Sequence, residues 1–161
     1  MSQVTQAGDF AAIRNLIDSM EEGDTELVRT PDGLVEYWVW PDEDAGPFSP
    51  RLLELASDTI GLDRRCRKEL LSRAEEAPFR EVLADFHRHF VQVVNAHGES
   101  SPGAGVVAML DRLRLCAVAL HTEPDRALSC DYRVADRDVS RYALTVYLST
   151  TGELVGIGIE S

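Results

Sequence analysis

The chain has 161 residues, the length of one ordinary domain, with 44% hydrophobic and 27% charged side chains. This balance is typical of a folded globular protein and excludes a mostly disordered chain, so we predict a single domain over residues 1–161. Acidic residues outnumber basic ones 28 to 16, which gives a formal net charge of −12. Such a surface repels phosphate backbones, which disfavours nucleic-acid binding, and it would attract a basic protein as partner. Maintenance of solubility is the simpler explanation of the charge.

The sequence points to a cytoplasmic protein. Its three cysteines, Cys66, Cys116 and Cys130, are odd in number and widely spaced, which predicts neither a disulfide framework nor a zinc site. No apolar run approaches the roughly 18 residues of a membrane span, and residues 1–9 lack the pattern of a secretory signal. No motif indicates a cofactor, and we predict none.

Residues 1–24 predict a short amphipathic helix. Asp9 is suited to cap its start and Gly23 to end it. Its apolar face comprises five residues at helical spacing: Phe10, Ile13, Leu16, Ile17 and Met20.

Residues 25–40 predict a β-hairpin. Strands are expected at Thr25–Arg29 and Leu34–Trp40. Between them Pro31–Gly33 is a turn signal, because proline presets φ and glycine accepts a positive φ. The Pro-rich acidic stretch Pro41–Pro50 follows as a loop.

Residues 50–97 predict helices. The first begins at Pro50 and breaks near Gly61, and the second starts after Asp63. A third and longer helix opens at Pro78. Its core stripe consists of Phe79, Val82, Leu83, Phe86, Phe90, Val93 and Val94.

Residues 106–160 predict an antiparallel β-meander that ends in a hairpin. Alternation over Tyr142–Ser149 and Val155–Ile159 defines its last two strands, and Gly152 supplies the turn between them. The whole pattern indicates an α+β fold, in which the N-terminal hairpin and the C-terminal meander form an antiparallel sheet with helices packed on one face.

The strongest candidate for a binding surface is the end of the N-terminal hairpin and the loop after it. Rigid aromatic rings beside negative charge are typical of binding hot spots. The candidate residues are Trp38, Trp40, Asp42, Glu43, Asp44 and Phe48. The alternative interpretation is that both tryptophans fill the core or cover a sheet edge, because large aromatic side chains are mostly buried.

Two glycines of the terminal hairpin, Gly156 and Gly158, share a face with Tyr147. Glycine within a strand often marks the close approach of a ligand or another backbone. Packing of the Tyr147 ring over a glycine is an alternative that requires no ligand.

Histidines on the long helix suggest a metal site only weakly. Asp85, His87 and His89 are the candidate ligands, but the H-x-x-x-H and E-x-x-H spacings usual on helices are absent. His87 and His89 are separated by about 200° around a helix. A solvated helix face is the simpler interpretation, and we predict no metal.

Catalytic motifs such as G-x-S-x-G are absent. The basic run Arg64–Lys68 suits an anion, but the solvated face of an amphipathic helix is the better explanation. We therefore predict a non-enzymatic protein-binding module, of the immunity or inhibitor type. The alternatives are a small metal-dependent hydrolase that uses the helix of His87 and His89, and a structural homodimer.

The terminal stretch Arg141–Leu148, together with Gly152-Glu153 and Ile157–Ser161, resembles a family of uncharacterised bacterial cytosolic proteins. Members of that family end in a D-Y-x-L-x-V-x-F-x-x-x-G-E strand pair that closes on Glu-Ser. Here Arg141 replaces the aspartate and Tyr147 the phenylalanine. The resemblance covers roughly residues 25–161. It implies an α+β fold and a cytoplasmic location, and it assigns no activity.

Overall fold

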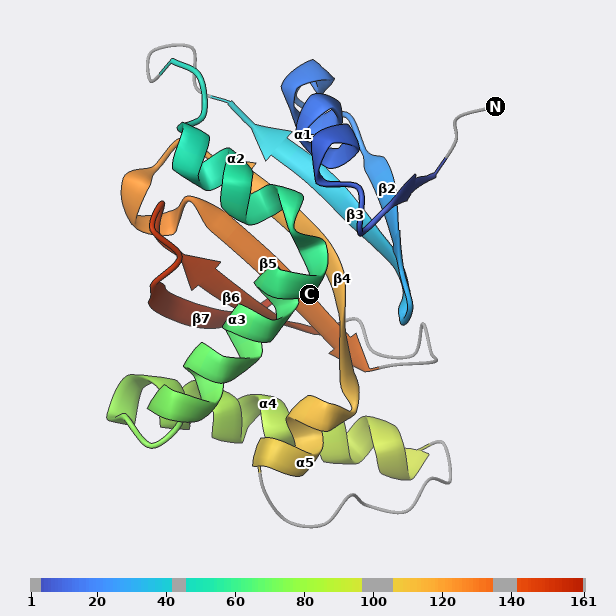
Figure 1. The fold of residues 1–161 in the computed structure, drawn as a ribbon. Helices are drawn as coiled ribbons and strands as arrows, with labels where there is room; N and C mark the ends of the chain where they lie inside the picture. Colours follow the sequence, from blue (N-terminus) through green and yellow to red (C-terminus); the bar gives the residue numbers. More distant parts are fainter. Residues whose placement is uncertain (1–3, 42–45, 97–105, 135–141, 161) are drawn as a thin grey trace.

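The computed structural model describes residues 4–41, 46–96, 106–134 and 142–160. Over these residues the protein has an α+β fold, in which a seven-stranded sheet packs against helices (Figure 1). The helices are α1 (Phe10–Ser19), α2 (Pro50–Ser57), α3 (Thr59–Arg73), α4 (Ala77–Ala96), α5 (Val106–Asp111) and the short 3-10 helix η1 (Pro124–Arg126). The strands are β1 (Thr5–Gln6), β2 (Glu26–Thr30), β3 (Gly33–Trp40), β4 (Leu113–His121), β5 (Leu128–Val134), β6 (Ala143–Leu148) and β7 (Leu154–Glu160).

The local turn and cap signals predict the hairpins and the start of the first helix correctly. The predicted end of that helix at Gly23 is wrong, because α1 stops at Ser19 and Met20 is its C-cap. Asp9 Oδ1 accepts the backbone N–H of Ala12 at 3.1 Å, which caps α1. Gly33 lies at a φ of +136° in the β2–β3 turn, and Gly152 at +84° in the β6–β7 turn. Both angles are in the region that favours glycine.

The prediction of a wholly antiparallel sheet is wrong, because the sheet is mixed. The strands lie side by side in chain order, from β1 to β7. The β2–β3 pair and the β4–β7 meander are antiparallel as predicted, whereas β1 pairs with β2 and β3 pairs with β4 in parallel. The segment from α2 to α5 returns the chain to the end of the sheet at which β3 began, so β4 runs in the same direction as β3.

Two boundaries also differ from the predictions. The meander does not start at residue 106, because α5 precedes β4 and buries Met109 and Leu110 while Val107 stays exposed. The break between α2 and α3 lies at Asp58 rather than at Gly61. Asp58 Oδ1 accepts the N–H of Gly61 at 3.0 Å, so Asp58 caps α3 and the glycine lies inside its first turn.

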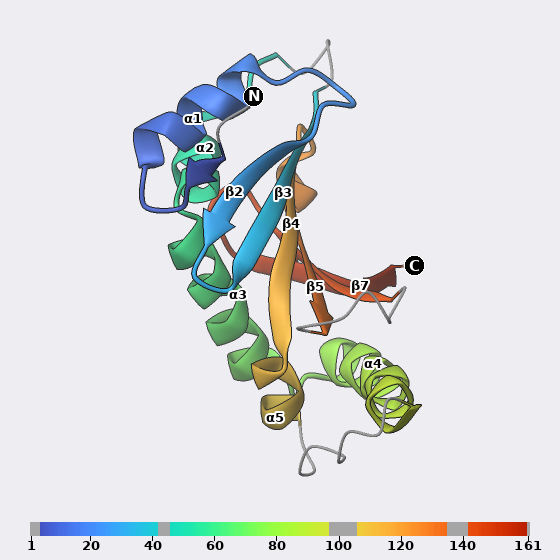
Figure 2. The same cartoon turned by 90° about the vertical axis from the view of Figure 1, so that its right-hand side faces the viewer.

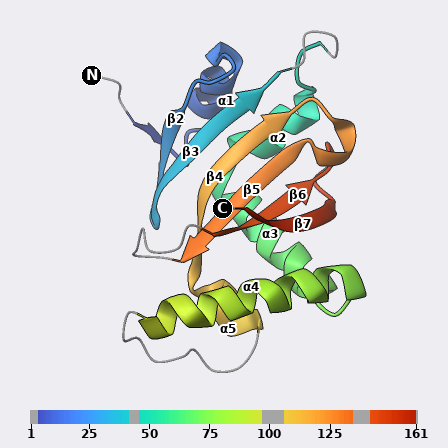
Figure 3. The same cartoon turned by 180° about the vertical axis from the view of Figure 1, so that it is seen from behind.

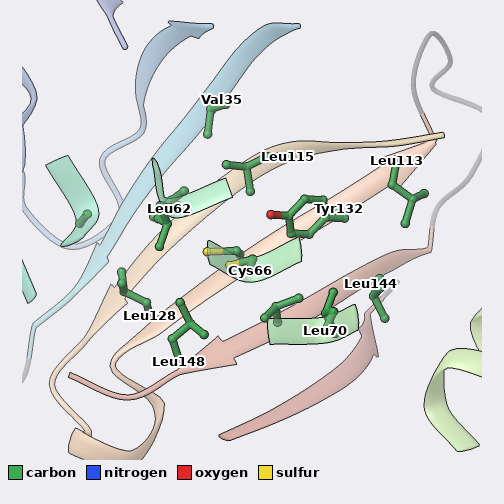
Figure 4. Close-up of a cluster of buried hydrophobic side chains, with 14 of the residues drawn as sticks. Val35, Leu62, Cys66, Leu70, Leu113, Leu115, Leu128, Tyr132, Leu144 and Leu148 are labelled. Atoms are coloured by element: carbon green, nitrogen blue, oxygen red, sulfur yellow. The ribbon is translucent and has the colours of Figure 1, made fainter. Parts of the chain in front are cut away.

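One face of the sheet is covered by α1, α2 and α3 (Figure 2), while α4 crosses the end of the sheet beside α5 and β7 (Figure 3). The core lies between α3 and β4–β6. In Figure 4, Cys66 and Leu70 of α3 lie in the same cluster of buried side chains as Tyr132 and Leu144 of the sheet. All three cysteines are free. A hydrogen bond with Cys66, together with burial, raises the pKa of Cys130 well above its usual value.

Buried hydroxyl groups connect the sheet to the helices. The Tyr37 hydroxyl of β3 donates to the carbonyl of Ala56 at 2.6 Å and lies 2.8 Å from Thr59 Oγ1. Burial raises the pKa of Tyr37 above its usual value, so this hydroxyl stays protonated. The contact fixes the α2–α3 junction over the middle of the sheet.

Three of the four arginines of α3 do more than form a solvated face. The guanidinium of Arg65 donates to the carbonyl of Gly152 at 3.1 Å, and that of Arg67 to the carbonyls of Leu110 and Leu113. Arg73 reaches the carbonyl of Leu154. These side chains therefore link α3 to the β6–β7 turn, to the start of β7 and to the α5–β4 junction.

No helix in the described part of the chain is long and apolar enough to cross a membrane.

Candidate functional site

The face of the sheet opposite α1–α3 carries a shallow hollow, which we call the sheet hollow. It has a volume of about 360 Å³. Figure 3 views this face, with α1–α3 behind the sheet and β3–β6 in front of them. The hollow is lined by Trp38, Trp40, Ala117, Ala119, His121, Ser129, Asp131, Thr145, Tyr147 and Glu160.

Strand register explains the shape of the hollow. Successive residues of a strand point to opposite faces of the sheet. On the open face Trp38 pairs with Ala119, which in turn pairs with Ser129, and Ser129 pairs with Tyr147 on the next strand. Small side chains therefore form the floor, and aromatic rings stand at both ends.

The two tryptophans form one wall of the sheet hollow. Their ring centroids are 6.4 Å apart and their planes differ by 2°. Trp40 is 42% exposed and Trp38 is partly buried. Two parallel indoles on an open sheet face offer flat surfaces to a cation or to another ring.

The opposite wall is the ring of Tyr147. A Cβ atom added at Gly158 would lie 3.6 Å from Cε2 of Tyr147, and one at Gly156 would lie 3.9 Å from Cδ2. The interpretation that Tyr147 packs over a glycine is therefore confirmed. On the same ring lies the guanidinium of Arg126, 4.6 Å from the centroid.

Polar groups in the sheet hollow are paired with one another. Asp131 Oδ1 accepts the Thr145 hydroxyl at 2.7 Å, and Glu160 Oε1 accepts the Tyr147 hydroxyl at 3.0 Å. Burial raises the pKa of Asp131 above its usual value. It also raises the pKa of Tyr147, with a contribution from the hydrogen bond to Glu160. These carboxylates are the negative charges that a ligand in the hollow would meet.

His121 and Ser129 form a histidine–hydroxyl pair, with 3.1 Å between Nε2 and Oγ. Burial lowers the pKa of His121, so its ring is neutral at neutral pH. Ser129 lies in β5 between β4 and β6, so its backbone N–H and carbonyl belong to the sheet ladders and do not form an oxyanion hole. We therefore interpret this pair as polar lining rather than as a catalytic dyad.

The structure places the other candidate binding residues away from the sheet hollow or outside its description. Phe48 is partly buried and packs against the core. Asp42, Glu43 and Asp44 lie outside the described residues. Of the three candidates that the structure describes, Trp38 and Trp40 line the hollow and Phe48 does not.

The histidine helix does not assemble a ligand set among the residues that the structure describes. Asp85 forms an ion pair with Arg88. The ring of His89 stacks on Tyr142 with centroids 4.5 Å apart, whereas that of His87 lies 6.3 Å from Phe90. Within the described ranges no three His, Cys, Asp or Glu side chains come close enough to hold a metal ion.

Asp131→Asn is expected to stabilise the fold at neutral pH. The pKa of this carboxyl is higher in the folded state than in the unfolded state. Its favourable contribution to the free energy of unfolding therefore exists at low pH and is lost as pH rises through the folded pKa. Asparagine does not ionise, so it avoids this loss of stability, and its side-chain oxygen still accepts the Thr145 hydroxyl. Thermal melting should show the variant above wild type at pH 7, with the difference shrinking near pH 4. A less stable variant at pH 7 would mean that the ionised carboxylate is stabilised by a cation.

No family model matches the chain, and no curated protein or solved structure matches it either.

Proposed function

We propose that the protein is a non-enzymatic binding module whose sheet hollow receives a basic segment of a partner protein. The observation that carries this proposal is the hollow itself, where two parallel indoles stand beside two carboxylates on a sheet face that α1–α3 leave open.

The chemistry of the sheet hollow suits an arginine or lysine side chain. A cation is attracted to the face of an indole within about 6 Å of its centroid, and Trp40 is exposed enough to offer that face. Asp131 and Glu160 supply negative charge, while His121 adds none when neutral. The net charge of −12 would speed the approach of a basic partner.

This function agrees with an immunity or inhibitor type of protein, which acts by occupying its partner. The free cysteines support a role in the cytoplasm, where thiols stay reduced. The family resemblance of the terminal strand pair also stays a proposal, and it agrees with this assignment without specifying a partner.

The test is capture and titration of the partner. Tagged wild-type protein and a Trp40→Ala variant are used at low salt to capture partners from the native host. Each captured protein is then purified and titrated by calorimetry. We expect one-to-one binding by wild type, weakened about thirtyfold in Trp40→Ala, because central aromatic anchors contribute about 2 kcal/mol. Asp131→Asn should also weaken binding.

Leu71→Ala is the matched control, because Leu71 on α3 is as exposed as Trp40 but lies outside the sheet hollow. Both tryptophans of the chain line the hollow, so all tryptophan emission arises there. A partner that binds without changing this emission, and equally well to Trp40→Ala, would place the interface elsewhere. Recovery of only a second copy of the chain would instead favour the homodimer.

A further inference from the structure

A second and larger cleft lies on the other side of the molecule, between α1, α2 and α3. We call it the arginine cleft. Its volume is about 620 Å³, which is within the usual range for sites that bind small molecules. Figure 1 shows α1 beside α2, with α3 continuing from α2. The arginine cleft shares no lining residue with the sheet hollow.

Part of the lining is apolar. Phe10, the first residue of α1, is 53% exposed at this cleft, although an aromatic ring of this size is more often buried. Leu55 and Leu62 contribute further apolar surface from α2 and α3. An apolar group in the arginine cleft would remove the Phe10 ring from water.

Each of the three helices adds an arginine to the same cleft: Arg14 from α1, Arg51 from α2 and Arg65 from α3. Their convergence is notable on a chain with net charge −12. Three guanidinium groups around a partly apolar cleft match a ligand that has both an anionic and an apolar part.

The two acidic residues that line the arginine cleft, Glu54 and Asp58, are outnumbered by its three arginines, so the lining keeps a net positive charge. Asp58 accepts a hydrogen bond from the N–H of Gly61 at the start of α3. Glu54 lies 3.7 Å from Arg51 in a pair whose arginine and glutamate side chains are 50% and 70% exposed, and such surface pairs are weak. Within the described ranges Arg14 forms no ion pair.

We propose that the arginine cleft binds a small organic acid with an apolar body. Its carboxylate or sulfonate group contacts Arg14 and Arg65, and its apolar body packs against Phe10 and Leu55. Arg65 also holds the β6–β7 turn through the carbonyl of Gly152, so it is partly fixed in place before a ligand arrives. This site is independent of the sheet hollow and of the partner proposed for it.

The test uses anilinonaphthalene sulfonate, a fluorescent probe with an apolar body and one negative charge, and its neutral analogue phenylnaphthylamine. We expect saturable one-to-one binding of the sulfonate by the folded protein. Arg14→Gln should weaken it at least about fivefold, because one charge-assisted contact is lost. Binding of the neutral analogue should change little in Arg14→Gln but weaken in Phe10→Ala.

The matched control is Arg64→Gln, which alters an exposed arginine of α3 that does not line the arginine cleft. Thermal melting of each variant confirms that it is folded, and Arg65→Gln serves as a second test of the charge. Equal affinity of the sulfonate for Arg14→Gln, Arg64→Gln and wild type would overturn the proposal. Loss of binding in Trp40→Ala instead would assign the probe to the sheet hollow.

Discussion

Phe86→Ala is expected to lower the free energy of unfolding by about 4 kcal/mol, far more than a substitution on the surface of the same helix. Phe86 is 1% exposed, in the middle of the stripe by which α4 packs on the rest of the protein. Truncation removes most of a buried ring and leaves a cavity that its neighbours fill only in part. Urea unfolding followed by circular dichroism measures the change.

Arg88→Ala on the same helix is the control. Arg88 is exposed and pairs with Asp85 at the surface, so its loss should change stability by less than about 1 kcal/mol. A loss of less than about 1.5 kcal/mol in Phe86→Ala would mean that α4 is not firmly docked against the sheet. The core would then not extend continuously from α3 to α4.

Arg67→Met is expected to cost about 3 kcal/mol, although Arg67 is a charged residue and only partly buried. Its guanidinium donates to Asp63 at 3.0 Å, to the carbonyl of Leu110 at 2.6 Å and to that of Leu113 at 2.7 Å. It also lies 5.2 Å from the ring centroid of Tyr132. Methionine keeps the apolar stem but removes the guanidinium donor from the carbonyls of Leu110 and Leu113, while Asp63 keeps the hydroxyl of Tyr132 as a donor.

Chemical denaturation of Arg67→Met and of Arg64→Met tests this role. Arg64 is the exposed neighbour on the same helix, and its replacement should stay within about 0.5 kcal/mol of wild type. If both variants lose the same small amount, the hydrogen bonds of Arg67 are replaced by water at no cost. The α5–β4 junction would then depend on apolar packing alone.

Patterns that act over a few residues predicted much of this fold. Alternation identified the strands other than β1, and the stripe that includes Phe79 and Phe86 identified α4, because each pattern reflects a face buried by its own element. The turn glycines Gly33 and Gly152 marked the hairpins for the same local reason. Local patterns do not show to which end of the sheet a long connection returns the chain. That end decides whether β4 runs parallel or antiparallel to β3.

For the candidate site too, local patterns predicted some residues and could not predict others. Trp38 and Trp40 stood out in the sequence because large aromatic rings are conspicuous at any position. His121, Ser129 and Asp131 did not, because each is an ordinary residue within an alternating strand. They become part of one surface only through the register between β3, β4 and β5. Arg65 and Arg67 of α3 were predicted to face solvent, and this was wrong for a related reason, since their acceptors are carbonyls distant in sequence.

The parallel β3–β4 pair also bears on how the chain folds. Residues 41–112 lie between the two strands, so their pairing closes a far longer loop than any hairpin of the β4–β7 meander. The entropic cost of closure grows with loop length, and contacts of high sequence separation slow folding. The β2–β3 hairpin and the meander each pair strands that are close in sequence. The pairing of β3 with β4, which forms the seam between these two parts of the sheet, is therefore the topologically demanding step. Because Trp38 and Trp40 stand on one side of the seam and Asp131 on the other, the sheet hollow exists only after that step is complete.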